Sequence, residues 1–497
     1  MSERDQKSIV QLVKLFLHEG YQLSPEAARL LVGDPDPVRR ATEVLEHVKK
    51  KDSRPYVITA DMIARDIKPA NESLFSIFKA PAEDWDFVNA DTQIAVHGIH
   101  PYPARMIPQI ACRLIDRYSK PYDLVLDPFC GSGTVVAESM LMKAHNSEKQ
   151  KLPRNAIGID INPLALVLAK VKSTPLDPSR LEEAVGDFLK ILDRRIYRLQ
   201  TGKLDVSVPT QETFPNIRHW FKDKVIGELA VIKEMIQAVE DPHVQDFFRV
   251  CFSLTVRKVS NIYNSGDTFI KRLSPQELRR HNPNVFNTFR QIVVDAHSRM
   301  KEFSRAYHAD VWSQVIPGDA RRLPISTGAV DLIVTSPPYG EEQNTISYTR
   351  WSKLSSIWLG FTPDAVRRSE KLSLGAKADD VSLETPSKTL DEILSQTARA
   401  NEKLAKSALA FFKDYALCLK EMSRVLKRNG FCCIVIGNRS LLRTRIPMDV
   451  VTKDFGGQVG FKIHDIIYRN IPTKAIPWIV AKGETIAKEN IIVLKKE

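Results

Sequence analysis

The segment 330–340 constrains the fold more strongly than any other part of the chain. Its apolar run, 332–334, has the composition of a strand buried in a parallel sheet. The run ends at Ser336-Pro337-Pro338-Tyr339, where consecutive prolines can neither extend a hydrogen-bonded ladder nor lie inside a helix. Because ligands bind at the carboxyl ends of strands in open α/β sheets, we expect a binding site here. A hydroxyl, a fixed carbonyl and an aromatic face can together hold a planar heterocycle that carries an amino group.

A second strand is predicted at 123–127, followed by the glycine-rich turn 128–133 and a helix that begins near Thr134. Gly131 and Gly133 allow a tight turn and a close approach of the backbone to a ligand. The helix presents free N–H groups and the positive end of its dipole, which suit a carboxylate or a phosphate. The spacing of this turn is neither the dinucleotide-binding Gly-x-Gly-x-x-Gly nor a P-loop.

The next predicted strand, 155–160, ends in the carboxylate of Asp160. An acid at the end of the second strand of such a sheet is a usual hydrogen-bond partner of ribose hydroxyls. Asp160 can also cap the helix that starts at Pro163, and the two roles are compatible.

These segments resemble a known family. The segment 335–339 resembles the catalytic motif of S-adenosylmethionine-dependent amino-methyltransferases of nucleic acids. Its serine form is similar to the cytosine-N4 DNA methyltransferases, whereas adenine-N6 enzymes more often carry Asp or Asn at the place of Ser336. The segment 127–134 resembles the cofactor loop of the same enzymes. The segments 97–106 and 318–324 resemble those that lie at the methionine end and the adenine end of the cofactor.

The resemblance implies an α/β fold with a Rossmann-like class I methyltransferase sheet, and S-adenosyl-L-methionine as the cofactor. The cofactor-binding residues that it implies are Tyr102, Pro103, Arg105, Asp127, Phe129, Gly131, Gly133, Thr134, Asp160, Asp319 and Ala320. The catalytic residues that it implies are Ser336, Pro337, Pro338 and Tyr339. The Ser336 hydroxyl and the Pro337 carbonyl would accept hydrogen bonds from the two N–H groups of an exocyclic amine, which would free the lone pair of its nitrogen. Tyr339 would stack on the ring.

This chemistry depends on positioning and requires no covalent nucleophile. A cytosine-C5 methyltransferase would need a reactive cysteine. None of the six cysteines lies in a Pro-Cys loop, and their spacing matches no metal site, so we expect no metal. A target base inside a duplex must be flipped out, at a cost of roughly a few kcal/mol.

Four regions are predicted along the chain: a small helical domain at 1–70, the cofactor half of the core at 71–174, a mainly helical insertion at 175–310, and the catalytic half at 311–497. The first region weakly resembles the amino-terminal helical module of the small subunit of archaeal family-D DNA polymerases, which implies an archaeal source. Near the carboxyl end, 430–438 is predicted to add a strand, and 463–469 with 490–494 to form an antiparallel hairpin.

The insertion is also the expected place for target recognition. It contains a basic cluster that could contact phosphates, although a solvated helix face is an equally good interpretation. The cluster is formed by Arg257, Lys258, Lys271, Arg272, Arg279 and Arg280. The residues expected to line the pocket for the target base are Asn344, Tyr348, Arg350 and Trp351.

Composition agrees with a nucleic-acid substrate. The chain has 72 Lys and Arg against 60 Asp and Glu, a formal net charge of +12 that suits a polyanionic partner. Few cysteines, no secretory signal and no apolar run of transmembrane length lead us to expect a cytoplasmic protein with no membrane partner.

The leading interpretation is a site-specific cytosine-N4 DNA methyltransferase. One alternative is an RNA methyltransferase, in particular one that acts on cytosine N4 of ribosomal RNA. Another is a non-catalytic nucleic-acid-binding protein that has kept a methyltransferase fold. The tRNA guanine-N2 enzymes share a similar Asp-Pro-Phe-Cys-Gly loop, but they usually carry Asp at the place of Ser336.

Overall fold

The chain divides into two compact units, Met1–Trp85 and Asp86–Glu497. The computed structural model describes residues 22–23, 41–42, 45, 57–58, 84–142, 152–263, 270–340, 346–376, 384–442, 444–471 and 488–497. In the first unit, β1 (Gln22–Leu23) pairs in parallel with β2 (Val57–Ile58). Most of the helical domain expected at 1–70 lies outside the described residues, so that expectation stays a prediction.

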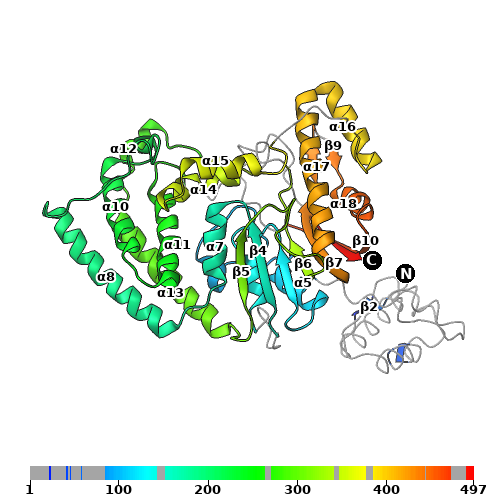
Figure 1. The fold of residues 1–497 in the computed structure, drawn as a ribbon, viewed down its shortest axis with the longest axis horizontal. Coiled ribbons are helices and arrows are strands. Elements are labelled where there is room, and N and C mark those ends of the chain that lie inside the picture. The colour runs from blue at the N-terminus through cyan, green and yellow to red at the C-terminus, as the bar shows by residue number, and fades with distance from the viewer. Residues whose placement is uncertain are drawn as a thin grey trace, which may run out of the picture. The chain divides into compact units, whose positions relative to one another are not determined.

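The second unit is built on a seven-stranded sheet with the order β10-β11-β7-β6-β3-β4-β5 (Figure 1). The strands are β3 (Leu124–Asp127), β4 (Asn155–Asp160), β5 (Ser313–Pro317), β6 (Val330–Thr335), β7 (Leu426–Gly437), β10 (Phe461–Asn470) and β11 (Lys488–Lys496). Strands β3 to β7 run parallel, β11 is antiparallel to β7, and β10 is antiparallel to β11. The predicted α/β fold class and the predicted carboxyl-terminal hairpin are confirmed.

The chain order places the switch point of the sheet between β3 and β6. From β3 the chain runs outward through β4 to β5, and it then returns to the other side of β3 as β6. Loops that follow β3 and β6 therefore diverge at their carboxyl ends, which is where open α/β sheets bind ligands.

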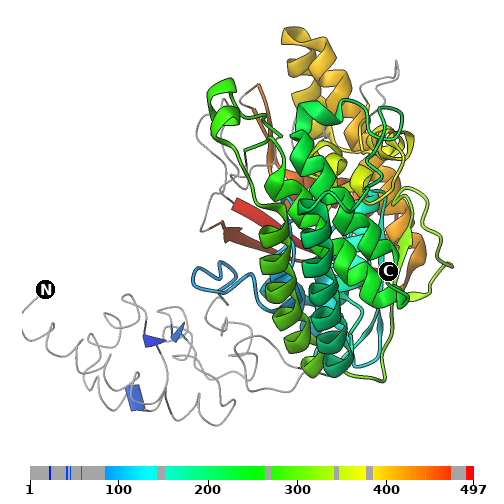
Figure 2. The ribbon, with the colours of Figure 1, turned by 90° about the vertical axis from the view of Figure 1, so that its left-hand side faces the viewer.

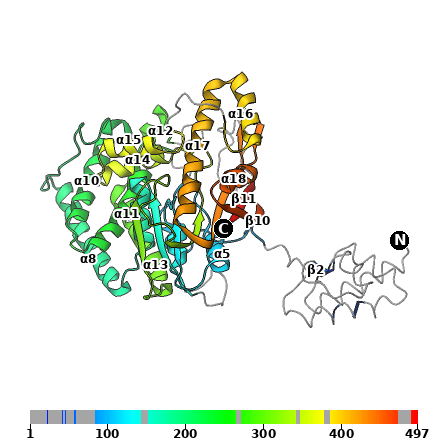
Figure 3. The same cartoon turned by 45° about the vertical axis from the view of Figure 1, so that its right-hand side comes forward.

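Helices cover both faces of the sheet. Leu126 and Ile333 share a buried apolar cluster with α17 (Glu402–Val425) and α18 (Met448–Gly457), and Figure 3 shows α18 beside the terminal hairpin. Side chains alternate along a strand, so the buried Val125 points to the opposite face. The remaining helices near the strands are α5 (Pro108–Tyr118), α6 (Thr134–Ser139) and α7 (Pro163–Lys172), with the 3-10 turn η2 (Ala95–Gly98) before them.

Between α7 and β5 the described chain is mainly helical. Its helices are α8 (Pro178–Gln200), α9 (Ile217–Trp220), α10 (Asp223–Gln237), α11 (Pro242–Val259), α12 (Pro275–Arg280) and α13 (Val285–Ala306). They form a bundle beside the sheet (Figure 2). Their buried side chains belong to one apolar cluster with Leu168 of α7 and with Trp358. The bundle therefore packs onto the core as part of the same unit.

The segment after β6 supplies the helices that lie near the carboxyl ends of the strands. These are α14 (Tyr348–Trp358) and α15 (Pro363–Leu372), followed by α16 (Lys388–Ala400). A small antiparallel pair, β8 (Arg439–Leu441) and β9 (Thr444–Ile446), follows β7. None of the helices described is both long enough and apolar enough to span a bilayer.

Candidate active site

The sheet order brings four loop segments into one row, because the carboxyl ends of β6, β3, β4 and β5 are neighbours. They line a cleft with about 1000 Å³ of empty space, including its open mouth. The predicted residues that line it are Tyr102, Pro103, Arg105, Asp127, Phe129, Gly131, Thr134, Asp160, Asp319, Ala320, Ser336, Pro338 and Tyr348. Motifs separated by more than 200 residues in the sequence thus meet around a single space.

The glycine-rich turn and the end of β4 are tied together by Asp160. One carboxylate oxygen of Asp160 accepts the Gly131 N–H at 2.9 Å, and the other accepts the Asn162 N–H at 2.8 Å. Gly131 has a φ of +49°, a conformation that a residue with a side chain rarely adopts. Each carboxylate oxygen can accept a further hydrogen bond, so Asp160 suits the hydroxyls of a ribose.

Gly133 lies where the glycine-rich turn packs closely against α7. Its φ is +84°, and a Cβ built on it would lie 2.7 Å from the Cα of Ala169 in α7. Gly133 is not one of the described residues that line the cleft. It is needed for close packing between the turn and α7, and its contact with the cofactor stays a prediction.

Two hydroxyls in the same turn point to a polar ligand. Ser132 and Thr134 line the cleft, and their hydroxyl oxygens are buried without a hydrogen-bond partner among the described residues. Buried hydroxyls are normally paired, so these two suit the carboxylate of a ligand. The guanidinium of Arg105 donates hydrogen bonds to the backbone oxygens of His97 and Thr92, so it holds these two segments of the chain together.

Asp127 joins the end of β3 to the end of β6. Its carboxylate accepts the Thr335 hydroxyl at 2.6 Å and the Phe129 N–H at 3.1 Å. The side chain is buried, and this burial raises the pKa of Asp127 to about 7, with the charge of Asp160 adding to the shift. The start of the Ser336–Tyr339 segment is therefore fixed to the glycine-rich turn by a carboxyl whose pKa lies near neutral pH.

The Ser336–Tyr339 segment divides between the cleft and the core. Ser336 and Pro338 line the cleft, whereas Pro337 is buried. The ring of Tyr339 packs against the cluster that contains α17, and its hydroxyl donates to Glu489 at 2.7 Å. Loss of hydration and the charge of Glu489 raise the pKa of Tyr339 well above its usual range, so the phenol stays protonated. Stacking of Tyr339 on a base stays a prediction.

Glu489 is a residue that sequence reasoning missed. It lies at the start of β11, 150 positions from Tyr339, and it also forms an ion pair with the buried Arg469. Nothing local in the sequence marks it, because the contact depends on how the terminal hairpin joins the sheet.

Aromatic side chains form one wall of the cleft. The ring of Tyr102 stacks on that of Tyr348 with centroids 6.0 Å apart, and it meets the ring of Trp351 edge-on at 5.6 Å. Trp351 is not among the described residues of the lining; Arg257 lies over its ring, 4.3 Å from the ring centroid, and donates to its backbone oxygen at 3.3 Å. Arg257 is 7% exposed, so the expectation that it contacts phosphates is corrected. It supports the wall.

The other predicted basic residues are exposed and are not among the described residues that line the cleft. They are Lys258, Lys271, Arg272, Arg279, Arg280 and Arg350. Arg272 donates to the backbone oxygen of His219 at 3.1 Å, and Arg350 lies 3.9 Å from Glu370. Asn344 lies outside the described residues.

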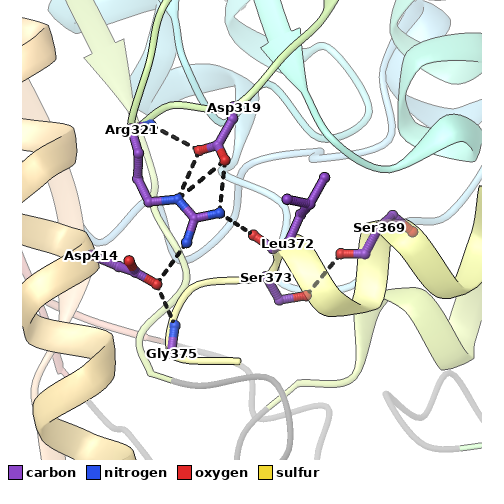
Figure 4. A network of polar contacts seen from close by, with 7 residues as sticks. All are labelled: Asp319, Arg321, Ser369, Leu372, Ser373, Gly375 and Asp414. Carbon is purple, nitrogen blue, oxygen red and sulfur yellow. Dashed lines mark hydrogen bonds and ion pairs between the residues drawn. The ribbon is translucent and has the colours of Figure 1, made fainter. Parts of the chain in front are cut away.

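Asp319 follows β5, and its ion pair with Arg321 is the second feature of the site that was not predicted from the sequence. Its carboxylate is gripped by Arg321, whose Nε and Nη2 lie 3.0 and 2.7 Å from the two oxygens (Figure 4). The close spacing of an acid and an arginine in the loop was visible in the sequence, but the fork geometry was not.

Comparisons with known proteins bear on this cleft. The family model for N6/N4 DNA methylases matches residues 37–170. The type II methyltransferase M.MvaI of Kocuria varians is 31% identical over 411 residues, which cover 79% of this chain and 87% of that protein. M.MjaII of Methanocaldococcus jannaschii is 23% identical over 340 residues, covering 52% of this chain and 62% of that protein.

Among solved structures, a TehB-like SAM-dependent methyltransferase of Corynebacterium glutamicum is 11% identical, with a TM-score of 0.26, and covers 78% of this chain and 87% of that chain. The relationship to M.MvaI extends over most of both proteins, and the matching family is the one that the cleft motifs resemble. This chain therefore belongs to the S-adenosylmethionine-dependent N4/N6 DNA methyltransferases.

Proposed function

We propose that this enzyme methylates the exocyclic N4 amine of cytosine in DNA. The observation that carries the proposal is Ser336, which lies at the carboxyl end of β6 and lines the same cleft as Asp160 and Asp319. Its hydroxyl is a compact hydrogen-bond acceptor, in keeping with the resemblance to cytosine-N4 enzymes. The adenine-N6 enzymes more often place Asp or Asn there.

The cleft suits the cofactor of this family at several atoms. Asp160 would hold the ribose hydroxyls, and the buried hydroxyls of Ser132 and Thr134 would donate to the methionine carboxylate. Asp319, at the end of β5, would accept the amino group of the adenine. When bound, S-adenosylmethionine supplies a methyl group that its sulfonium charge has already activated.

The target amine needs help from the protein because its lone pair is delocalised into the cytosine ring. The Ser336 hydroxyl and the Pro337 carbonyl would each accept a hydrogen bond from one N–H of the amine, which favours a tetrahedral nitrogen and frees the lone pair. The hydrogen bond from Thr335 to Asp127 holds the end of β6 in place while this happens. The protein therefore contributes mainly by positioning.

A flipped base would enter beside the aromatic wall. Tyr348 and Tyr102 line the cleft together with Ser336, and aromatic faces bind unpaired bases by stacking, at about 1–3 kcal/mol per base. The net charge of +12 supports a polyanionic substrate, whose phosphates the exposed lysines and arginines of the helical bundle would meet.

The proposal is tested in a host that lacks N4-methylcytosine. The protein and its Ser336→Ala variant are expressed in parallel, and nucleosides from host DNA and RNA are separated and weighed by mass spectrometry. We expect N4-methyldeoxycytidine with the wild-type protein only. N6-methyldeoxyadenosine in its place would contradict the assignment of the base, and N4-methylcytidine in RNA alone would contradict the assignment of the polymer.

A further inference from the structure

Arg321 connects three segments that are distant in the sequence (Figure 4). Its guanidinium grips the carboxylate of Asp319, donates to Asp414 of α17 at 2.8 Å, and donates to the backbone oxygen of Leu372 at 2.8 Å. Asp414 in turn accepts the N–H of Gly375 at 2.9 Å. The Leu372–Gly375 turn at the end of α15 is thus held at both ends.

Two of the three segments that Arg321 joins line the cleft, whereas Asp414 of α17 is not among the described residues of its lining. Leu372, Ser373 and Leu374 line the cleft on one side, and Asp319 lines it on another. Arg321 itself is 19% exposed and is not among the described residues of the lining. It therefore acts on the cleft through its partners.

Asp319 follows strand β5, and this position indicates which end of the cofactor would lie beside Asp319 and the Leu372–Leu374 segment. Ser336 on β6 marks where the methyl group must be delivered, and Asp160 on β4 suits the ribose. The strand order β6-β3-β4-β5 then leaves the end of β5 for the adenine.

We propose that Arg321 is a positioning residue for the adenine end of the cofactor. It fixes the Asp319 carboxylate as an acceptor for the adenine amino group, and it closes the Leu372–Leu374 wall over the ring. An arginine is needed because only its planar fork can serve three acceptors in fixed directions. The proposal rests on the cofactor placement proposed above and is independent of which base is methylated.

The chain offers a matched control in Arg424. This residue also belongs to a network between α17 and the loop after β5, since it donates to the backbone oxygens of Leu323 and Ile325 at 3.0 and 2.8 Å and pairs with Glu421. Neither Leu323 nor Ile325 lines the cleft in the described part of the chain. Removal of Arg424 should therefore affect stability without affecting the adenine site.

The test is calorimetric titration of S-adenosylhomocysteine into the purified full chain. We expect Arg321→Ala to raise the Kd about tenfold, equivalent to ~1.4 kcal/mol. Arg321→Lys, which keeps the charge but not the fork, and Asp414→Asn, which weakens the anchor on α17, should give smaller losses in the same direction. Arg424→Ala should stay within about twofold of the wild-type Kd.

A second ligand distinguishes a specific loss of the contact with the adenine amino group from a general loss of order in the cleft. S-inosylhomocysteine carries a carbonyl where adenine has its amino group, so wild-type protein should prefer the adenine ligand, and this preference should shrink in Arg321→Ala and persist in Arg424→Ala. If Arg321→Ala folds, an unchanged Kd for S-adenosylhomocysteine and an unchanged preference for the adenine ligand would overturn the proposal. If it does not fold, the same unchanged values in both Arg321→Lys and Asp414→Asn would overturn it. Equal losses in Arg424→Ala would overturn it as well.

Discussion

The two ends of the cleft are built in different ways. At the proposed cofactor end, the direct partners of the carboxylates lie nearer in the sequence: Asp319 is held by Arg321, two positions away, and Asp160 by Gly131, 29 positions away, and the long-range contact is the anchor of Arg321 on Asp414, 93 positions away. At the target end, the partners are remote: Tyr339 is held by Glu489, 150 positions away, and Trp351 is supported by Arg257, 94 positions away.

This difference indicates how the enzyme can vary. A cofactor site built from short motifs keeps its geometry wherever the strand-turn-helix units form. A target site that depends on a helical insertion and a terminal hairpin changes whenever those elements change. The cofactor end should therefore respond mainly in affinity when it is altered, and the target end mainly in rate.

The largest effect on methyl transfer is expected when the Ser336 hydroxyl is removed. Ser336→Ala should lower kcat at least about a hundredfold, the loss typical of one hydrogen bond made in the transition state. Its Kd for S-adenosylhomocysteine should match that of the wild-type protein. Single-turnover methyl transfer measured beside calorimetry separates the two quantities, and wild-type kcat in a folded Ser336→Ala protein would remove Ser336 from catalysis.

Asp160→Ala should act on affinity. It removes the acceptor that we propose for the ribose hydroxyls and also leaves the N–H groups of Gly131 and Asn162 without this acceptor. We expect a loss of roughly 1–3 kcal/mol in cofactor binding. Calorimetry of the folded variant checks this value, and an unchanged affinity would show that Asp160 only braces the turn.

Tyr339→Phe probes the remote anchor of the target end. It keeps the ring but loses the hydrogen bond to Glu489, so we expect kcat to fall about tenfold, in line with ~1.5 kcal/mol for a hydrogen bond to a charged group. Cofactor affinity should not change. Glu489→Gln is the matched variant, because glutamine still offers an oxygen to the tyrosine. A kcat in Tyr339→Phe equal to that of wild type would show that the anchor does not matter for transfer.

The smallest effect is a pH dependence at the junction of the two ends. Asp127, with its pKa raised to about 7 by burial, is partly protonated at neutral pH. A cationic sulfonium in the cleft favours the carboxylate, so S-adenosylmethionine should release a proton on binding and bind several-fold tighter at about pH 8 than at about pH 6. The neutral thioether S-adenosylhomocysteine should show a weaker dependence.

Asp127→Asn is the control for this effect, because the amide cannot titrate but can still accept from Thr335. In the wild-type protein the folded carboxyl binds its proton more tightly than the unfolded one, so this group makes stability fall as the pH rises from about 4 to about 7. Thermal unfolding of Asp127→Asn should lack that contribution. Identical pH profiles in the two proteins, for binding and for unfolding, would contradict the titration of Asp127.

The sequence predicted which motifs meet at the cleft better than it predicted the side chains that hold them in place, for a physical reason. Asp160, Gly131 and Asp319 sit in strand-turn patterns that are local, and the structure brings them to one cleft. Glu489 could not be predicted, since its contact follows from the pairing of β11 with β7.

The surroundings of Arg257 and Gly133 could not be predicted either, because they depend on how distant elements pack. Arg257 looked like a surface cation until α11 was seen to be buried on most sides, with Phe247, Phe252 and Val256 in the core. Gly133 carries a packing constraint that no spacing reveals. The archaeal source and the cytoplasmic location stay predictions.

The most direct test of the whole account is transfer of a labelled methyl group by the purified protein to a mixture of genomic DNA and total RNA. The products are digested to nucleosides, and the labelled species are identified by mass. We expect label in N4-methyldeoxycytidine, and we expect Ser336→Ala to lose this label while it retains S-adenosylhomocysteine binding. Label in N6-methyladenine, in 5-methylcytosine or only in RNA nucleosides would contradict it.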